Sequence, residues 1–484
     1  MRSMPALVAA AWLVLPPDLA RGAGTDGPEA AGRSTEAPAA GAPSGAAPFA
    51  GTPPAEALPA GAGRQAGAAP CGSSEGIEAG PRLSAWMEKR KEKCGRLSPY
   101  EPTFVERQML AFEKAERPSI LQLNFAGFYP RFQTIDHRSQ SAFGLRYWRP
   151  DLGGSRFDLN GSAFWSIQGF RYYEAQAGVV PHRGKAFPLF ALKADDVFEL
   201  ENVRQDDDTP YMLYASFSRR WAPKFDFFGI GPGSRAEDRS DFRQQDTLVE
   251  GVAGYRVLPK LTVIGRLGFY TADIGPGTDE DLPQLEDVFD PATIPGFERQ
   301  PDFLRYGLNA IFDGRDVPKN PHRGGLLAVQ WKRFAERGGS ANSFSRYAVD
   351  GRVYLALGHP QRVLALRVYA SRDDPAAGAR VPFYLQSWLG SSHTLRAHVS
   401  QRFRGEKLAL FQAEYRWEAS PSIELAAFVD TGTVAARAED GFEDFRTDRG
   451  IGLRIKTHEL TALRFDCAWG DEGFRLLFRF GASF

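Results

Sequence analysis

The stretch that decides the class of fold is GFRLLFRFGASF, residues 473–484 at the end of the chain. Every second side chain in it is apolar: Phe474, Leu476, Phe478, Phe480, Ala482 and Phe484. A period of two indicates a β-strand. Aromatic residues along one face and arginines along the other are typical of a barrel strand with lipid on one side and a wet lumen on the other.

A strand of a soluble β-sandwich would show the same alternation, so the rest of the chain has to separate these alternatives. From Ile120 onward the sequence repeats alternating segments and turns, and after Phe484 nothing follows to cover an exposed edge. The last strand is therefore expected to pair with the first and close the sheet. The predicted fold is all-β, a 16-stranded antiparallel transmembrane β-barrel, because single-chain bacterial barrels have an even number of strands.

The expected strands account for most of the chain after Ile120. Their ranges are 120–134, 138–149, 154–166, 169–181, 209–222, 241–257, 261–273, 303–314, 323–335, 344–357, 361–371, 402–418, 421–431, 446–457, 461–470 and 473–484. By this count, the segment from Pro181 to Thr209 is a long connection, unless it holds an extra strand or a helix.

The first 118 residues have a different composition. Arg2, an apolar run from Pro5 to Leu15 and small residues near Ala23 predict a signal peptide over residues 1–23, although a buried N-terminal helix is the alternative. Residues 24–81 are rich in Ala, Gly and Pro, which predicts a disordered linker. Residues 82–118 carry apolar side chains at helical spacing and predict either short periplasmic helices or a partner-docking segment. The barrel is expected to span residues 119–484.

The composition and the cysteines limit the remaining possibilities. The 484 residues carry no formal net charge, so no nucleic-acid partner is expected, and no apolar run of about 18 residues after the N-terminus indicates a helical membrane span. In an oxidising periplasm Cys71 and Cys94 either form a disulfide or remain free thiols. Cys467 is expected on the lipid face of a strand.

The alternation of side chains assigns lumen and lipid faces to the later strands, and the apolar content of one loop indicates that this loop is sheltered. In the strand 421–431, Glu424, Phe428 and Asp430 are expected to face the lumen. The loop 371–401 carries an apolar run from Val381 to Leu389 that an exposed loop has little reason to hold. This loop is therefore expected to fold into the barrel.

Several segments resemble the BamA/TamA family of outer-membrane barrels, also called bacterial surface antigens. They are FDGRD at 312–316, LRAH at 395–398, RFR at 402–404, EYR at 414–416, FVDTG at 428–432, GIGLR at 450–454 and the terminal Phe484. The resemblance covers roughly residues 120–484. It implies a location in the outer membrane of a Gram-negative bacterium.

In that family the extracellular loop before the twelfth strand plugs the lumen, and the arginine of its tip meets a Phe-x-Asp-x-Gly motif on the thirteenth strand. The resemblance implies a contact formed by Leu395, Arg396, Ala397, His398, Phe428, Asp430 and Gly432. Ala397 stands where the family has glycine, and His398 where it has an aromatic residue. The alternative is that Asp430 only caps the strand end and Arg396 points to solvent.

The resemblance also implies a C-terminal assembly signal formed by Phe478, Phe480 and Phe484, because the family's insertion machinery reads a terminal aromatic residue. Family members that insert or export proteins open a seam between the first and last strands and receive client chains on POTRA modules. Residues 24–118 are too rich in Ala, Gly and Pro to fold as such a module.

Two functions remain open. The first is insertion or export of proteins at the outer membrane, with membrane lipids, client outer-membrane proteins and periplasmic or lipoprotein partners that supply POTRA-like modules. The second is a passive channel or structural barrel. The sequence has no Gly-x-Ser-x-Gly, no His-Glu-x-x-His and no phosphate-binding glycine loop, so no enzyme, cofactor or metal site is predicted.

Overall fold

The computed structural model describes residues 104, 107, 125–180, 209–318, 320–456, 461–480 and 484. The predicted signal peptide and linker, nearly all of the segment 82–118, the cysteines Cys71 and Cys94 and the connection 181–208 lie outside these residues.

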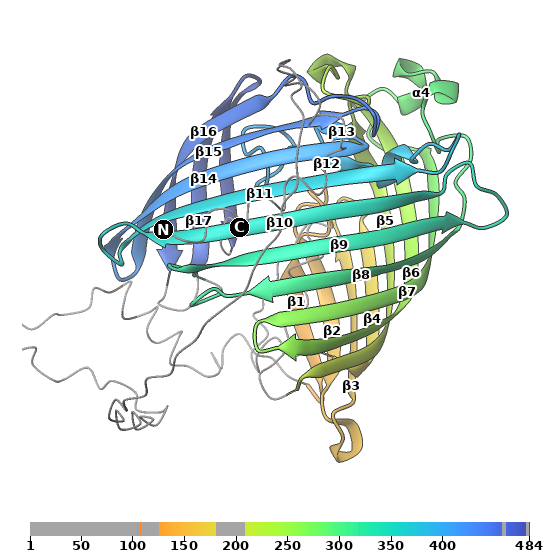
Figure 1. The fold of residues 1–484 in the computed structure, drawn as a ribbon. Helices are drawn as coiled ribbons and strands as arrows, with labels where there is room; N and C mark the ends of the chain where they lie inside the picture. The colour runs from red at the N-terminus through yellow and green to blue at the C-terminus, as the bar shows by residue number, and fades with distance from the viewer. Residues whose placement is uncertain are drawn as a thin grey trace, which may run out of the picture. The chain divides into compact units, whose positions relative to one another are not determined.

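The described residues form one antiparallel sheet of 16 strands, which confirms the predicted class and strand number (Figure 1). Each strand pairs with the next along the chain, except that β14 follows β11 in the sheet. The strands are β1 (Phe128–Gln133), β2 (Ala142–Arg149), β3 (Asp158–Ser166), β4 (Arg171–Val179), β5 (Tyr211–Phe227), β6 (Ser240–Leu258), β7 (Leu261–Pro276), β8 (Phe303–Asp313), β9 (Gly324–Glu336), β10 (Phe344–Ala356), β11 (Arg362–Pro375), β14 (Lys407–Ser420), β15 (Ile423–Ala435), β16 (Arg446–Lys456), β17 (Thr461–Gly470) and β18 (Gly473–Phe480).

The remaining elements are short. A two-stranded sheet pairs β12 (Ser387–Leu389) with β13 (Phe403–Gly405). The helical turns are η2 (Leu152–Gly154), η4 (Ala236–Asp238), α4 (Leu285–Val288), η5 (Pro291–Thr293) and η6 (Phe383–Leu385). Within the described part of the chain, no helix is long and apolar enough to cross a membrane.

The period-two alternation gives the large sheet two different faces. In β15, Ile423, Leu425 and Val429 are exposed, whereas Phe428 and Asp430 are buried, as parity predicts. We call the buried side the inner face and the other the outer face. The outer face carries apolar side chains along successive strands, among them Leu267, Leu308, Leu366, Phe411, Ile451 and Phe478. The half-buried Cys467 lies between Phe465 and Trp469 on that face.

Residues 376–406, between β11 and β14, leave the sheet and pack against its inner face. We call this segment the inner loop. Its Phe383 lies 5.2 Å from the ring of Phe227 and 5.1 Å from that of Phe242, measured between ring centroids. Its Leu395 and Phe403 share a buried apolar cluster with residues of β10, β11, β14 and β15. The inner loop is therefore held by apolar contacts with strands on both sides of its own position in the sheet.

The two ends of the sheet are short strands in the part of the chain that the structure describes. β1 has six residues and β18 has eight, against 17 in β5 and 19 in β6. Among the described residues the ladder runs from β1 to β18, and no pairing joins these two strands. The expected closure of the sheet is thus not part of the described hydrogen bonding.

Two expectations are corrected. The strand expected at 402–418 begins at Lys407, because residues 403–405 pair with β12 in the inner loop. Phe484 was expected on the outer face, in phase with Phe474, yet it is buried against Tyr354, Val363 and Ala365 of the inner face. The physical reason is that Tyr354, Val363 and Ala365 bind this residue from across the sheet, a contact that the alternation of its own segment does not encode.

Candidate functional site

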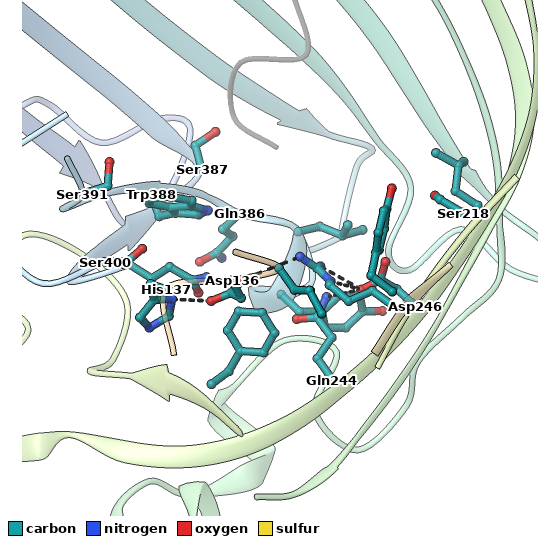
Figure 2. Close-up of a pocket in the computed structure, with 18 of the residues that line it drawn as sticks. Asp136, His137, Ser218, Gln244, Asp246, Gln386, Ser387, Trp388, Ser391 and Ser400 are labelled. Atoms are coloured by element: carbon teal, nitrogen blue, oxygen red, sulfur yellow. Dashed lines mark hydrogen bonds and ion pairs between the residues drawn. The ribbon is translucent and has the colours of Figure 1, made fainter. Parts of the chain in front are cut away.

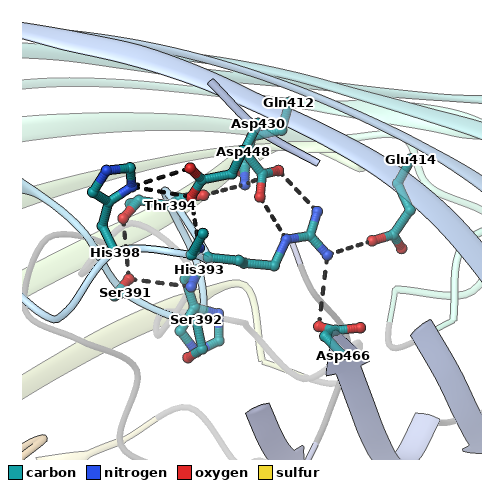
Figure 3. Close-up of polar contacts among 12 residues, drawn as sticks. Ser391, Ser392, His393, Thr394, His398, Gln412, Glu414, Asp430, Asp448 and Asp466 are labelled. Carbon is teal, nitrogen blue, oxygen red and sulfur yellow. Dashed lines mark hydrogen bonds and ion pairs between the residues drawn. The ribbon is translucent and has the colours of Figure 1, made fainter. Parts of the chain in front are cut away.

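The tip of the inner loop, residues 395–398, is held by Arg396. Its Nε lies 2.6 Å from Asp430 Oδ2 and its Nη2 lies 2.8 Å from Asp430 Oδ1, so both prongs of the guanidinium donate to one carboxylate (Figure 3). Its Nη1 donates to Glu414 Oε2 at 2.9 Å and lies 3.6 Å from Asp466 Oδ2. Arg396 thereby binds carboxylates from β14, β15 and β17, and it is fully buried.

This arrangement suits a guanidinium for two reasons. The guanidinium of Arg396 is planar and carries several donors in fixed directions, a geometry that lysine cannot reproduce. Burial opposes its charge, but Asp430 and then Glu414 and Asp466 raise the pKa of Arg396 further above its ordinary range. The loop tip therefore carries a permanent positive charge into an acidic pocket.

Further ion pairs surround this pocket. Glu414 also accepts from Arg416 Nε at 2.7 Å and from Arg454 Nη2 at 2.8 Å, and Arg464 Nε lies 3.0 Å from Asp466. The buried network consists of Arg396, Arg416, Arg454 and Arg464 with Glu414, Glu424, Asp430 and Asp466. Its cations and anions are equal in number, which keeps so many buried charges from repelling one another.

Phe428 forms the floor beneath Arg396. The guanidinium carbon lies 3.4 Å from the centroid of the Phe428 ring, a cation–π contact in a desolvated place. Phe428 also packs with Ala397 and Ala468. The ring fits because Gly450 faces it from β16, where an added Cβ would lie 2.3 Å from Phe428 Cζ.

His398 fastens the other side of the tip. Its Nδ1 lies 3.0 Å from Asp448 Oδ1 and its Nε2 lies 2.8 Å from Asp471 Oδ1, while the neighbouring Ala397 N donates to Asp448 Oδ2 at 2.6 Å. Burial alone would lower the pKa of His398, but the hydrogen bond and charge of Asp448, with Glu472 and Asp471, raise it above 6.5. Where the family has an aromatic residue, this chain has a residue that binds two acids.

The backbone of the tip is shaped by short polar contacts. Gly390 N donates to Thr394 Oγ1 at 3.1 Å, and Thr394 O accepts from Gln412 Nε2 at 3.0 Å. The same Gln412 amide donates to Asp430 at 2.9 Å, which links the turn to the acid that holds Arg396. Gly432 leaves room for the loop, because a Cβ there would lie 3.0 Å from Leu389 Cδ1.

The last part of the inner loop, residues 402–404, contacts segments that lie far apart in the sheet. Arg402 Nη1 and Nη2 donate to Ser234 Oγ and O at 2.9 and 2.8 Å, and its Nε donates to Glu472 at 2.7 Å. Arg404 Nη1 donates to Phe383 O at 2.6 Å. Ser234 precedes β6 and Glu472 precedes β18, so one loop segment bridges distant parts of the sheet.

Beside the inner loop lies a polar cavity of about 590 Å³ (Figure 2). Its lining includes Glu174 of β4, Arg266 of β7, Lys332 of β9 and Arg479 of β18, together with Trp388 of the loop. Since strands from both halves of the sheet border one cavity, the sheet curves around it. Among the described residues, no group of three or more His, Cys, Asp or Glu side chains is placed to hold a metal ion.

The predicted site residues are therefore brought together in part. Leu395, Arg396, Ala397, His398, Phe428, Asp430 and Gly432 all lie at the loop tip or against the loop. Phe478 lies on the outer face and Phe484 on the inner face, so these two do not form one surface. The side chain of Phe480 and both Cys71 and Cys94 are outside what the structure describes.

Sequence reasoning missed the partners of His398 and the place of Phe484. Asp448 falls on the inward parity of its strand, so it could have been selected as a candidate. Asp471 lies in the turn before β18, and nothing in the local sequence signals its contact with a residue 73 positions away.

A sheet of 16 antiparallel strands, apolar on its outer face and charged on its inner face, is typical of barrels of the bacterial outer membrane. The chain belongs to the Omp85 superfamily, whose domain matches residues 133–484. It resembles the BamA/TamA type within this superfamily, and it is an outer-membrane protein.

Among solved structures, BamA from Haemophilus ducreyi lacking POTRA domains 1–3 is similar, with a TM-score of 0.51, 12% identity and coverage of 73% of this chain and 68% of that chain. CdiB from Acinetobacter baumannii has a TM-score of 0.43, 12% identity and coverage of 70% and 56%. CdiB from Escherichia coli has a TM-score of 0.41, 11% identity and coverage of 73% and 60%. No curated protein matches the chain.

Proposed function

We propose that this chain is an outer-membrane barrel that acts in the insertion or export of proteins, with the inner loop as its resting plug. The observation that supports this most is the attachment of the loop tip. Arg396 and His398 bind acids on β14, β15, β16, β17 and the turn before β18. These are the last strands of the sheet, and they end at β18.

The loop tip would therefore hold one side of the seam between β18 and β1 as a rigid wall. The seam itself would be weak, because the described parts of β1 and β18, with six and eight residues, are short and offer few backbone pairs to each other. A strand edge that opens presents unpaired backbone groups, which is the template that an incoming client strand needs. Opening of the seam would be reversible, because the loop tip keeps strands β14 to β17 in their register while β18 separates from β1.

The proposal includes a set of partners. The apolar outer face would contact membrane lipids, and the clients would be other outer-membrane or exported proteins. Periplasmic or lipoprotein partners would supply POTRA-like modules, since residues 24–118 are too rich in Ala, Gly and Pro to fold as one. The chain would carry out no covalent chemistry.

The test is reconstitution. The purified chain in liposomes should accelerate the folding of a denatured outer-membrane barrel into the same liposomes, compared with empty ones. Arg396→Ala should reduce this acceleration, whereas Val429→Ala, an outward neighbour of Asp430, should not. If the chain and empty liposomes give equal folding rates with candidate partner modules present, the insertion role is wrong.

The alternative function is a passive channel, and the polar cavity beside the loop favours it. Ten arginine and lysine side chains line this cavity against five aspartates and glutamates. A channel with this lining would pass anions more readily than cations. Conductance of the intact protein separates the two functions, because a plugged barrel conducts poorly.

A further inference from the structure

The cavity beside the inner loop carries an excess of positive charge. Ten arginine and lysine side chains line it against five aspartates and glutamates. Most of these cations form ion pairs with acids. Three of the arginines form no ion pair with any residue that the structure describes, and we call them the basic wall: Arg404 of β13 and Arg475 and Arg479 of β18.

Arg404 is the most deeply buried member of the basic wall, at 3% exposed. Its Nη1 donates to Phe383 O at 2.6 Å and its Nη2 donates to Gln401 Oε1, so both go to uncharged oxygens. Its Nε has no acceptor among the described residues. Burial lowers the pKa of Arg404 to about 10, and the charge of Asp136 opposes this only in part. Arg404 therefore borders the cavity with a charge that no adjacent carboxylate balances.

The other two arginines lie four residues apart on β18, so their side chains share its inner face. Arg475 Nη1 donates to His398 O, and Arg479 Nε donates to Ser392 Oγ at 3.0 Å. Both arginines are half-buried and line the cavity. Two like charges on one face repel each other, and an anion bound between them would remove this repulsion.

Uncharged donors around the cavity also lack acceptors. The Tyr384 hydroxyl of the inner loop and Gln330 Nε2 of β9 are buried, and neither has a hydrogen-bond partner in the described part of the chain. Ser400 of the inner loop, labelled in Figure 2, is 8% exposed, and its hydroxyl forms no hydrogen bond with a described residue. A ligand that suits these walls supplies acceptors and negative charge.

We propose that this cavity is a binding site for a phosphate-bearing anion, held by the basic wall from the inner loop and from β18. A phosphoryl group offers three acceptor oxygens and up to about two negative charges, and a guanidinium donates to two such oxygens at once. A cavity of about 590 Å³ also has room for an organic group attached to the phosphate. The site needs only the barrel with its inner loop in place, so it does not rest on the proposed role in protein insertion.

The first experiment titrates inorganic pyrophosphate into the full chain, folded in an uncharged detergent, by isothermal titration calorimetry. Pyrophosphate should bind with a dissociation constant below about 1 mM. Arg479→Gln should weaken binding by about tenfold or more, because it removes a charged donor. Arg479→Lys should recover only part of the loss, since lysine keeps the charge and lacks the two-pronged geometry. Arg235→Gln, at an exposed arginine outside the cavity, is the matched control and should bind like wild type.

Heat-modifiable mobility shows whether each variant is folded. If Arg479→Gln does not fold, Ser400→Ala tests the same cavity with a smaller change and should weaken binding several-fold. Citrate tests whether charge alone is recognised, and it should bind at least about tenfold more weakly than pyrophosphate. Absence of pyrophosphate binding, equal binding by wild type and the folded cavity variant, or equal affinity for citrate would overturn the proposal.

The second experiment separates the two sources of a phosphoryl group, a soluble ester and a lipid headgroup. Glycerol 3-phosphate and dihexanoyl phosphatidic acid each compete with pyrophosphate, with glycerol and dihexanoylglycerol as controls that lack the phosphoryl group. Displacement at the lower concentration by glycerol 3-phosphate supports a soluble ester, and displacement at the lower concentration by the lipid supports a headgroup. Displacement by neither, or equal displacement by the controls, would show that the cavity does not recognise a phosphoryl group on an organic ligand.

Discussion

Removal of Arg396 should release the loop tip more than removal of Asp430 does. Arg396→Ala leaves Asp430, Glu414 and Asp466 without their shared cation, whereas Asp430→Ala leaves Arg396 with two of its three acids. Breaking a buried pair by removing one partner costs about 3–5 kcal/mol. Full burial of Arg396 and Asp430 places Arg396→Ala at the upper end of that range, and the remaining acids place Asp430→Ala at the lower end.

Hydrogen exchange of the amides at residues 394–398 measures the local opening of the tip. For Asp430→Ala, at the lower end of the range, a loss of about 3 kcal/mol in the opening free energy corresponds to roughly a hundredfold faster exchange, and Arg396→Ala should exchange faster still. The double variant should be little worse than Arg396→Ala alone, because both single changes remove the same interaction. Val429→Ala is the matched control on the outer face of the same strand, and it should leave exchange at the tip unchanged.

Two results would refute this reasoning. If Arg396→Ala and Asp430→Ala were additive in the double variant, the pair would not be the contact that holds the tip. If Arg396→Lys exchanged as slowly as wild type, the two-pronged geometry would be irrelevant, since lysine keeps the charge and loses the fork.

Three further predictions concern other contacts. Because the pKa of His398 is raised in the folded protein, the stability that this residue contributes is complete below about pH 6.5 and is lost as the pH rises through the folded pKa. Hydrogen exchange at the tip, corrected for its intrinsic pH dependence, should therefore accelerate as the pH rises. His398→Gln should abolish this pH dependence, and a pH dependence that persists in the variant would exclude His398 as the cause. Gly450→Ala should destabilise the fold by about 1–3 kcal/mol in urea unfolding, since the new Cβ would lie 2.2 Å from Cys467 O and 2.3 Å from Phe428 Cζ, whereas Gly251→Ala, with its nearest atom at 3.9 Å, should be near neutral. Deletion of Phe484 should reduce the heat-modifiable, folded form in membrane fractions of cells, and normal levels would count against a terminal assembly signal.

The sequence predicted the strands well because alternation is a local property. The strand expected at 461–470 has these bounds in the structure, and that expected at 446–457 differs from Arg446–Lys456 by one residue. Parity also placed Asp430 and Phe428 on the inner face, and with the family motif it gave the contact with Arg396. An inward side chain needs only the register of its own strand.

The contacts that the sequence did not predict depend on distances across the sheet. His398 meets Asp448 and Asp471 because the inner loop enters to a particular depth, which no single segment encodes. The alternation of residues 473–484 predicts Phe484 on the outer face, but the residue packs on the inner face against Tyr354, Val363 and Ala365 of β10 and β11. This contact joins distant strands, so the local period does not predict it.

The central claim is that the inner loop fills the interior of the barrel at rest, and single-channel conductance in planar bilayers tests it most directly. The intact protein should conduct poorly, because Val381, Phe383 and Leu395 are fully buried against the strands. Deletion of residues 381–400 should raise the conductance several-fold in a barrel that still shows heat-modifiable mobility. An intact protein that conducts like an open porin, or a deletion that leaves the conductance unchanged, would contradict the claim.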